Sequence, residues 1–415
     1  MNRTVIFKIC SLLLVMTICL TVTACKNKGG SNTVSGSSSR GASSTDSQST
    51  DSSGSESTDS QNPDSESPDT VVSRTSSESS GGGTITVTET KNVPYDASKN
   101  PLQRGVNFSN FEYDDIEIGY DNWIFQSKYY DAVREKGFDH IRLPVNFFCH
   151  MGGAPDYKID EEFLRKIDTI INIAISSNLK IVLDFHHFGE LQTNVSGNKQ
   201  KYYKMWQQLA EHYQSYPSGL VFELFNEPGN ADAISKGGPD IVTPEKLIEI
   251  QEEAIKIIRK TNPTRLIVHA TCWNDGAAQL MTTEPLLPDD NNLIMSVHSY
   301  EPMAFTHQGA DWNNTGNPRP STDFTEDMKY EIQLIFEMVK NYREKYGRPV
   351  WIGEFGTLKS KAPEGARAKY ADFIVETMKD AGCGWCWWEF QSGFGLYNTS
   401  RDEWIDDALM AALMK

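Results

Sequence analysis

From about residue 85 to its end, the chain alternates short apolar runs with longer amphipathic segments, and this alternation constrains the fold more than any other feature. The longer segments, such as 160–178 and 244–262, place apolar residues at i, i+3, i+4 and i+7, which predicts helices with one buried face. Short strands that alternate with such helices form βαβ units and a parallel sheet. Eight units within about 310 residues predict an α/β protein, a (β/α)8 TIM barrel. The strands are expected at 104–108, 140–145, 180–187, 220–227, 265–270, 293–300, 350–355 and 384–390.

Polar and aromatic residues stand at the ends of the expected strands, where a barrel places its functional residues. An open, doubly wound sheet is the main alternative, but no G-x-G-x-x-G motif follows the first expected strand. The pattern of strand ends therefore favours the barrel. The residues concerned are Arg142 in the second strand, His186 and His187 ending the third, Asn226 and Glu227 ending the fourth, His298 and Tyr300 ending the sixth, Glu354 in the seventh, and Trp387 and Trp388 in the eighth.

Residues 1–24 have the pattern of a signal peptide, with two basic residues before the apolar run 9–22. That run is short for a membrane span, which needs roughly 20 apolar residues. The sequence VTAC at 22–25 resembles the bacterial lipobox, and the resemblance implies cleavage before Cys25 and lipidation of its thiol. An uncleaved N-terminal anchor is the alternative. Both readings place the rest of the chain outside the cytoplasmic membrane on a tether.

Residues 25–84 are dominated by Ser, Thr, Gly and Asp and contain no aromatic residue. Such a segment cannot bury enough apolar surface to offset its ordering entropy, so we predict a flexible linker that leads into one folded domain at 85–415. The formal net charge of the whole chain is -17, and no Lys/Arg-rich cluster stands out. Nucleic acid is therefore an unsuitable partner. We interpret the acidity as a source of solubility, compatible with a neutral polymer as substrate.

Four cysteines remain beyond the signal peptide and Cys25. Cys383 and Cys386 have the C-x-x-C spacing of a redox or zinc pair, but no second pair completes a four-cysteine site. Their apolar context indicates a strand. We expect these two residues, Cys149 and Cys272 to be packed free thiols, with a disulfide as the open alternative.

Two of the strand-end residues are glutamates on opposite sides of the expected ring. Strands four and seven of an eight-stranded barrel lie roughly across from each other, so Glu227 and Glu354 can face each other over its mouth. Two carboxylates that flank one bond are what glycoside hydrolysis requires: one gives a proton to the leaving oxygen, and the other stays ionised. The neighbours of each group set which carboxylate holds the proton.

The motifs IRLP, LDFHH, FELFNEP, HSYEP and IGEFG occur in this order, with RGVNFSNFE at the first strand and WWEFQSGFGLY at the eighth. Through them, residues 103–412 closely resemble glycoside hydrolase family 5, the cellulase and mannanase family of clan A. The resemblance implies that Glu227 is the acid/base and Glu354 the nucleophile. It also implies supporting roles: Asn226 contacts the sugar 2-hydroxyl, Arg142 pairs with the nucleophile, His186 and His298 lie near the catalytic sugar, Tyr300 hydrogen-bonds the nucleophile, and Trp388 floors the sugar site.

Other residues near the strand ends have simpler interpretations. Glu223 is expected to face the same side as Glu227 and to be an ion-pair partner inside the barrel. His187 is interpreted as a packing or backbone-bonding residue, and Trp387 as core. Glu301 and Glu389 follow strand ends and could bind sugar, but neither is counted among the site residues. The histidines lack the paired spacing of metal hydrolases, so we expect neither a metal nor a cofactor.

Aromatic residues in the loops are expected to be exposed and suit a sugar polymer, because pyranose faces stack on rings. Trp273, Trp312, Phe305 and Tyr397 lie in loops after strands five, six and eight, and together favour a glycan cleft. The first loop, NFSNFEYDDIEIGYDNW, departs from the NLGN of many family members. This departure leaves the substrate specificity open.

These observations predict a monomeric, surface-tethered, retaining endo-β-1,4-glucanase, a cellulase that acts on β-1,4-linked polysaccharide and touches the membrane through its lipid anchor at Cys25. An endo-β-1,4-mannanase is the nearest alternative. A non-catalytic glycan-binding lipoprotein would be favoured by loss of either glutamate, and both are present. A solute-binding lipoprotein would need two lobes rather than eight serial βα units.

Overall fold

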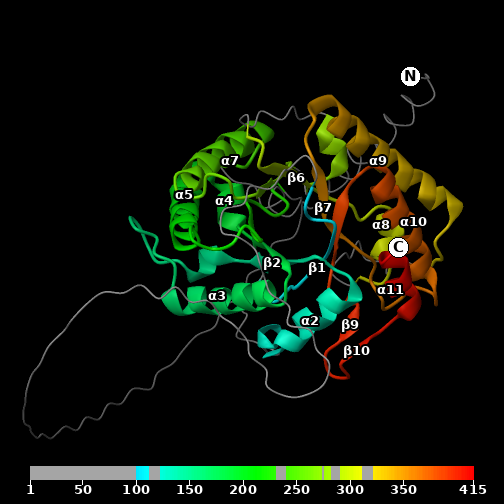
Figure 1. Ribbon diagram of the computed structural model, residues 1–415. Helices are drawn as coiled ribbons and strands as arrows, with labels where there is room; N and C mark the ends of the chain where they lie inside the picture. The colour runs from blue at the N-terminus through cyan, green and yellow to red at the C-terminus, as the bar shows by residue number, and fades with distance from the viewer. Residues whose placement is uncertain (1–99, 112–121, 230–239, 273–274, 282–289, 311–320) are drawn as a thin grey trace, which may run out of the picture. The chain divides into compact units, whose positions relative to one another are not determined.

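The computed structural model describes residues 100–111, 122–229, 240–272, 275–281, 290–310 and 321–415. The predicted signal peptide, Cys25 and the linker lie outside these residues. Eight parallel strands form a closed barrel in which each strand pairs with the next and β8 pairs with β1 (Figure 1). This closure confirms the (β/α)8 prediction and excludes the open sheet. The strands are β1 Arg104–Asn107, β2 His140–Val145, β3 Lys180–Phe185, β4 Leu220–Glu223, β5 Ile267–His269, β6 Leu293–His298, β7 Val350–Phe355 and β8 Gly384–Trp387.

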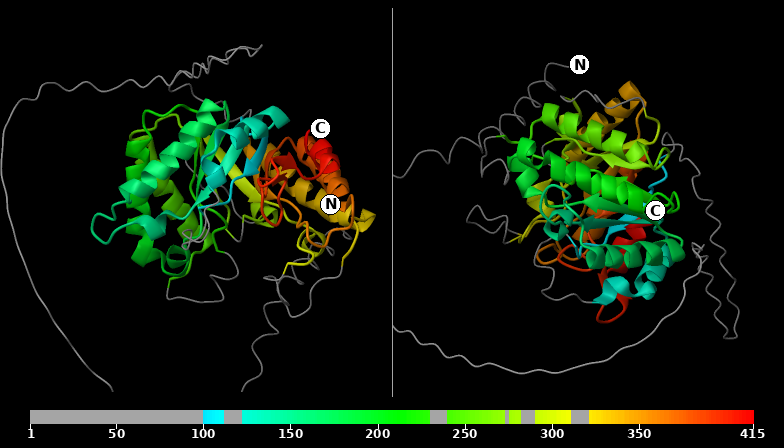
Figure 2. Two further views of the ribbon diagram at one scale, coloured as in Figure 1. Left: turned by 90° about the horizontal axis from the view of Figure 1, so that it is seen from below. Right: turned by 90° about the vertical axis from the view of Figure 1, so that its left-hand side faces the viewer.

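Helices surround the strands, and the last helix lies beside α10 (Figures 1 and 2). They begin and end at residues that suit those positions: the Asp160 side chain accepts the Phe163 amide at the start of α3, and Gly137 adopts the left-handed conformation after α2. The helices are α2 Ser127–Lys136, α3 Glu161–Ser176, α4 Gly189–Thr193, α5 Val195–His212, α7 Pro244–Arg259, α8 Met303–Thr306, α9 Glu326–Tyr346, α10 Ala366–Asp380 and α11 Asp407–Leu413. Shorter pieces are the 3-10 turns η2 Asn122–Phe125, η3 Phe147–His150 and η4 Ala277–Met281, and a hairpin of β9 Tyr397–Asn398 with β10 Glu403–Trp404.

The barrel interior has an apolar layer at one end and a polar layer at the other. Because side chains alternate along a strand, residues two apart share a face. Val182 and Val221 belong to a buried apolar cluster, and Asp184 and Glu223, two residues further along the same strands, form the polar layer above it. The other members of the apolar layer are Leu102, Leu266, Val268, Ile294, Trp351 and Cys386. A second, larger apolar core lies between the strands and the surrounding helices.

Several strands end earlier than the sequence predicts. β3 stops at Phe185 and β4 at Glu223, whereas the predicted strands continue for two and four more residues, to 187 and 227. Beyond these points His187 has φ 47° and Glu227 has φ 44°, in the left-handed region that a strand does not use. The chain therefore leaves the ladder just before the residues expected at the strand ends.

β7 contains an irregularity that turns one side chain inward. Strict alternation from Trp351, which lies in the inner apolar layer, would place Gly353 inside and Glu354 outside. The register shifts on both edges of β7, so that His298 pairs with Glu354 and Phe355 pairs with Trp387. A bulge of this kind re-aims a side chain. Glu354 consequently faces the barrel mouth.

All four cysteines in the described part of the chain are free thiols. Cys272, Cys383 and Cys386 are buried, which agrees with packed thiols, but Cys149 is exposed, and its expected burial was wrong. The C-x-x-C spacing makes no disulfide because Cys386 points into the barrel layer, whereas Cys383 lies just before β8 in the outer core. Within the described ranges, no helix combines the length and the apolar character needed to cross a membrane.

Candidate active site

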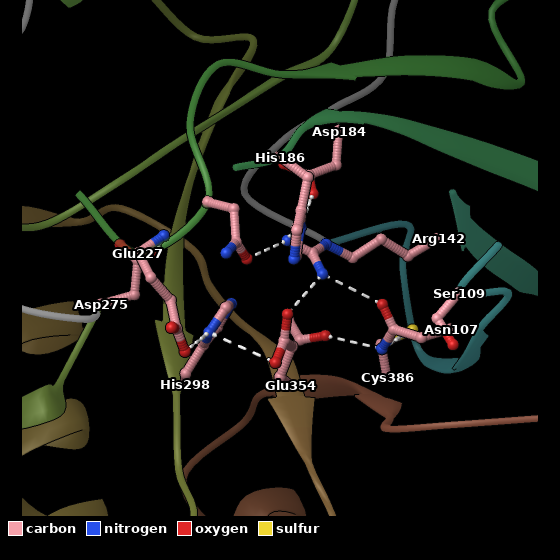
Figure 3. Close-up of polar contacts among 12 residues, drawn as sticks. Asn107, Ser109, Arg142, Asp184, His186, Glu227, Asp275, His298, Glu354 and Cys386 are labelled. Atoms are coloured by element: carbon pink, nitrogen blue, oxygen red, sulfur yellow. Dashed lines mark hydrogen bonds and ion pairs between the residues drawn. The ribbon is translucent and has the colours of Figure 1, made fainter. Parts of the chain in front are cut away.

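Arg142 stands at the centre of the polar layer and is fully buried. Its Nε and one Nη donate to Glu223 at 2.7 and 3.2 Å. Its other Nη donates to Glu354 at 2.7 Å (Figure 3). Asp184 lies 3.0 Å from the same guanidinium. One cation thus faces three carboxylates, and a planar guanidinium with five donors can satisfy such a set.

Glu354 reaches this cluster from β7 with only 5% of its surface exposed. One carboxylate oxygen accepts from Arg142 at 2.7 Å, and the other accepts from the Tyr300 hydroxyl at 2.9 Å. Burial raises the pKa of Glu354, while His298, Arg142 and the Tyr300 hydroxyl act to lower it. Its two strong donors favour the ionised form.

Glu227 approaches from the loop after β4, and its side chain is 27% exposed. Its carboxylate lies 2.9 Å from Nδ1 of His298, and its backbone N–H donates to the Asp275 carboxylate at 2.8 Å. Burial raises the pKa of Glu227 to about 7, against a smaller lowering by Arg142. Glu227 therefore holds a proton much more readily than an ordinary glutamate.

Two buried histidines border the pair of glutamates. Burial lowers the pKa of His298 to about 4, so its imidazole is neutral near pH 7. Burial also holds the pKa of His186 well below its usual range, and His186 Nδ1 lies 2.7 Å from Asp184. Since Asp184 is an acceptor, Nδ1 of neutral His186 carries the hydrogen, and its Nε2 is left as an acceptor.

Tyr300 and Trp388 complete the mouth with partly exposed rings. Both pack against a small apolar cluster of Ala310, Leu358 and Phe394, which fixes their orientation. The Trp388 ring is nearly parallel to His186, with an interplanar angle of 9° and centroids 6.0 Å apart. The mouth therefore combines two carboxylates, two neutral histidines and flat aromatic surface.

The family model described as cellulase, glycosyl hydrolase family 5, matches residues 95–393. The chain belongs to glycoside hydrolase family 5. This family 5 enzyme is 28% identical to Endoglucanase A of Ruminococcus albus over 327 residues, which are 72% of this chain and 84% of the relative. It is 29% identical to Endoglucanase H of Acetivibrio thermocellus, but it covers only 26% of that longer protein.

Solved structures give the same assignment. Thermotoga maritima Cel5A, an endoglucanase, is 32% identical with a TM-score of 0.68, and the match covers 76% of this chain and 98% of that one. The cellulose synthase subunit Z of Clostridioides difficile is 33% identical with a TM-score of 0.66, over 76% and 100% of the two chains. The family 5 protein is therefore a glycoside hydrolase. Its endoglucanase relatives favour the glucanase prediction over the mannanase alternative.

The structure brings together all the residues that were predicted for the family 5 site. Asn226 accepts from Arg142 at 2.8 Å through its Oδ1 and lies beside Glu227. Glu223 is a buried ion-pair partner of Arg142, and Trp387 is fully buried, as expected. The remaining predicted residues are Glu354, His186, His298, Tyr300 and Trp388, with the contacts given above.

Some expectations about neighbouring residues were wrong. His187 is exposed, which contradicts packing in the core but does not test the alternative of a bond to the backbone. Its left-handed backbone turns it out of the strand, and its ring lies edge-on to that of His186 with centroids 4.4 Å apart. Phe305 and Tyr397, expected as exposed cleft aromatics, are buried in the core. Trp273, Trp312 and positions 112–121 of the first loop lie outside the described residues.

Four polar residues in the site were missed or undervalued from sequence. Asn107 on β1 accepts from Arg142 at 3.0 Å, and Asp184 orients His186. Asp184 could have been found, because it stands two residues before His186 and so shares its face. Asp275 follows β5 with no pattern to mark it. Glu389 is buried, contacts two serine hydroxyls, and has its pKa raised to about 7 by burial.

Glu227, His298 and Glu354 also form the group of described residues whose donor atoms could hold a metal ion, because these atoms lie within 4.8 Å of one another. Carboxylates and imidazole are ligands that zinc accepts. The Arg142 guanidinium, 2.7 Å from Glu354, places positive charge beside the same oxygens and disfavours a cation there. The convergence serves paired-carboxylate chemistry equally well.

Proposed function

We propose that the protein is a retaining endo-β-1,4-glucanase in which Glu227 is the acid/base and Glu354 the nucleophile. The observation that carries this proposal is the facing pair of carboxylates: one oxygen of each, with a nitrogen of His298, lies within 4.8 Å of the others. Inverting enzymes keep their carboxyls about 6.5–9.5 Å apart, whereas retaining enzymes keep them about 5–5.5 Å apart. The short separation supports direct attack by a carboxylate rather than by an intervening water.

The first step forms a glycosyl-enzyme. The Glu354 carboxylate attacks the anomeric carbon while the bond from that carbon to the leaving oxygen breaks, and Glu227 gives its proton to that oxygen. Arg142 and Tyr300 suit Glu354 to this role because they favour its ionised form. The raised pKa of Glu227, about 7, suits it to deliver the proton.

The second step releases the sugar. Glu227, now ionised, removes a proton from water, and the water oxygen attacks the anomeric carbon as its bond to Glu354 breaks. Two inversions restore the original configuration. Neutral His298, 2.9 Å from Glu227, can share a hydrogen bond with either protonation state of that carboxyl because its ring tautomer can change.

Neighbouring groups are placed to hold the sugar. Asn226 uses its Oδ1 on Arg142, which leaves its amide NH₂ to donate to the sugar 2-hydroxyl. Trp388 and Tyr300 offer partly exposed ring surface on which a pyranose face can stack. We propose glucan as the substrate. Mannan is included in the test because Thermotoga maritima Cel5A has been solved with both cellobiose and mannotriose.

We further propose that the enzyme is a monomer, secreted and tethered to the bacterial cell surface. Support for the location comes from the signal-like residues 1–24, the lipobox-like sequence that ends at Cys25, and the Ser/Thr-rich segment up to residue 84. A long flexible tether would let the catalytic domain reach an insoluble polymer while the anchor holds it at the surface.

A substrate panel tests the function. The protein is assayed on carboxymethylcellulose, mixed-linkage β-glucan, glucomannan, galactomannan and xylan, with NMR of the initial product from a soluble β-glucan oligosaccharide. We expect cleavage of the glucose-containing β-1,4 polymers and a product of retained configuration. Activity confined to galactomannan would overturn the substrate, and an inverted product would overturn the nucleophile.

Azide rescue assigns the two glutamates. With Glu227→Ala, a 2,4-dinitrophenyl β-cellobioside should still glycosylate the enzyme in a burst, and azide should then give a glycosyl azide of retained configuration, because azide needs no general base. With Glu354→Ala, azide should attack the opposite face and give an inverted product. Rescue of the opposite kind in each variant would mean that the two roles are exchanged.

A further inference from the structure

Asp275 lies in the loop after β5, which ends at His269, and it is fully buried. It forms hydrogen bonds to residues that follow or end three different strands. Its Oδ2 accepts the backbone N–H of Glu227 at 2.8 Å, and its Oδ1 accepts the backbone N–H of Thr271 at 2.7 Å. Its own carbonyl accepts the backbone N–H of His298 at 2.9 Å. A single residue therefore connects the loop after β4, the loop after β5 and the end of β6.

These bonds close a ring around the proton donor. The Glu227 carboxylate meets His298 Nδ1 at 2.9 Å, so Glu227 and His298 are joined to each other directly and, through their backbones, to Asp275 (Figure 3). Each of the three contacts restrains a different degree of freedom. Movement of the Glu227 backbone would therefore also disturb the backbone of His298 and the side-chain hydrogen bond between the two residues.

The conformation of Glu227 explains why such a restraint is needed. Its φ of 44° lies in a region that is unfavourable for a non-glycine residue and persists only where the surroundings fix it. Asp275 bonds its N–H, and Gln192 bonds the N–H of Gly229 at 2.7 Å two residues later. Released from Asp275, the loop can relax towards ordinary φ values, which would swing the Glu227 carboxyl away from His298.

We propose that Asp275 is a positioning residue for proton donation, which holds Glu227 at the glycosidic oxygen without touching the substrate itself. The inference rests on the proposed role of Glu227. It predicts a selective defect: only steps that need the Glu227 proton or base should suffer. Attack by Glu354 on a substrate with a good leaving group should proceed normally, because Arg142 and Tyr300 still hold Glu354.

The test compares Asp275→Asn and Asp275→Ala with the parent enzyme on two substrates. Phenyl β-cellobioside needs protonation of its leaving oxygen, and 2,4-dinitrophenyl β-cellobioside does not. We expect kcat/KM on the phenyl substrate to fall about 10–100-fold, as a misplacement near 1 Å does, while kcat/KM on the dinitrophenyl substrate stays within about threefold. Asparagine can still accept one of the two N–H bonds, so its effect should be the smaller.

Gln251→Ala is the matched control. Gln251 is buried and forms hydrogen bonds to the start of the loop after β5. Its Oε1 accepts the Ala270 N–H at 2.8 Å, and its Nε2 donates to the Ala270 carbonyl at 3.2 Å. It bonds no atom of Glu227 in these contacts. Its variant should lower the melting temperature without changing the ratio between the two substrates.

Two outcomes would overturn the inference. If kcat/KM falls equally on both substrates, so that their ratio is unchanged as in the Gln251 control, Asp275 has only a structural role. If kcat/KM is unchanged on both substrates, Asp275 has no role in proton donation. Should Asp275→Ala fail to fold, the asparagine variant carries the comparison. Glu227→Ala is run alongside: if it lacks the selective loss on the phenyl substrate, the acid assignment itself fails, and that failure is distinguishable from a failure of Asp275 alone.

Discussion

Raising the pH through 7 should remove the proton that Glu227 donates, and the activity should follow. Burial raises the pKa of Glu227 from 4.5 to about 7. A shift of this size corresponds to about 3 kcal/mol in favour of the protonated form. At pH 6 a carboxyl with this pKa is about nine-tenths protonated, whereas one with the ordinary value would be about 3% protonated. The environment of Glu227 thus supplies about a thirtyfold larger population of competent acid at pH 6.

The assay is kcat/KM for phenyl β-cellobioside between pH 5 and 9, because this quantity reports the ionisations of the free enzyme. We expect an alkaline limb with a midpoint near pH 7 and a tenfold fall per unit above it. The limb should be absent for the dinitrophenyl substrate, which does not need the acid. Asp184 and Glu223 also have pKa values raised to about 7 by burial, so a variant is needed to assign the limb.

Glu227→Gln makes that assignment. It preserves the size of the side chain and cannot donate a carboxylic proton, so the phenyl substrate should react slowly and without the limb near pH 7. Persistence of the limb in this variant would assign it to another group, such as Glu223. A wild-type limb near pH 4.5 would refute the idea that burial keeps Glu227 protonated.

Three further predictions follow from single contacts. Tyr300→Phe removes a 2.9 Å hydrogen bond that favours ionised Glu354, so the acidic limb of the kcat/KM profile should move to higher pH. The rate should fall about 10–100-fold, because a hydrogen bond to a charged group is worth about 1.5–3 kcal/mol. An acidic limb at the wild-type pH would contradict this prediction. Glu223→Ala strips the buried Arg142 of its bidentate partner and should lower the free energy of unfolding by about 3–5 kcal/mol in urea denaturation, whereas an unchanged midpoint would show that the pair is dispensable. Cys25→Ala should abolish lipid labelling and release active enzyme from the membrane fraction; continued retention would indicate an uncleaved anchor.

The barrel could be predicted from the sequence because its signals are local. A period of 3.6 in the long segments and short apolar runs between them specify eight βα units, and a closed parallel barrel buries every apolar face of such units. Glu227 and Arg142 could be placed near the mouth for the same reason, since position along a strand fixes height in a barrel. The resemblance of the ordered motifs to the family then predicted which glutamate is the acid/base and which is the nucleophile.

The tertiary structure decided how those residues face each other. Alternation along β7 would have turned Glu354 outward, and the bulge that reverses it depends on pairing with β6 and β8, which no local pattern encodes. The same holds for Glu227, whose backbone is left-handed and whose N–H donates to Asp275, 48 positions away in the chain. Their pKa values depend on burial and on charges from other strands, so protonation is a property of the folded barrel. Sequence periodicity specifies which elements form, because that depends on neighbours along the chain, whereas the orientation and charge of a catalytic group depend on neighbours in space.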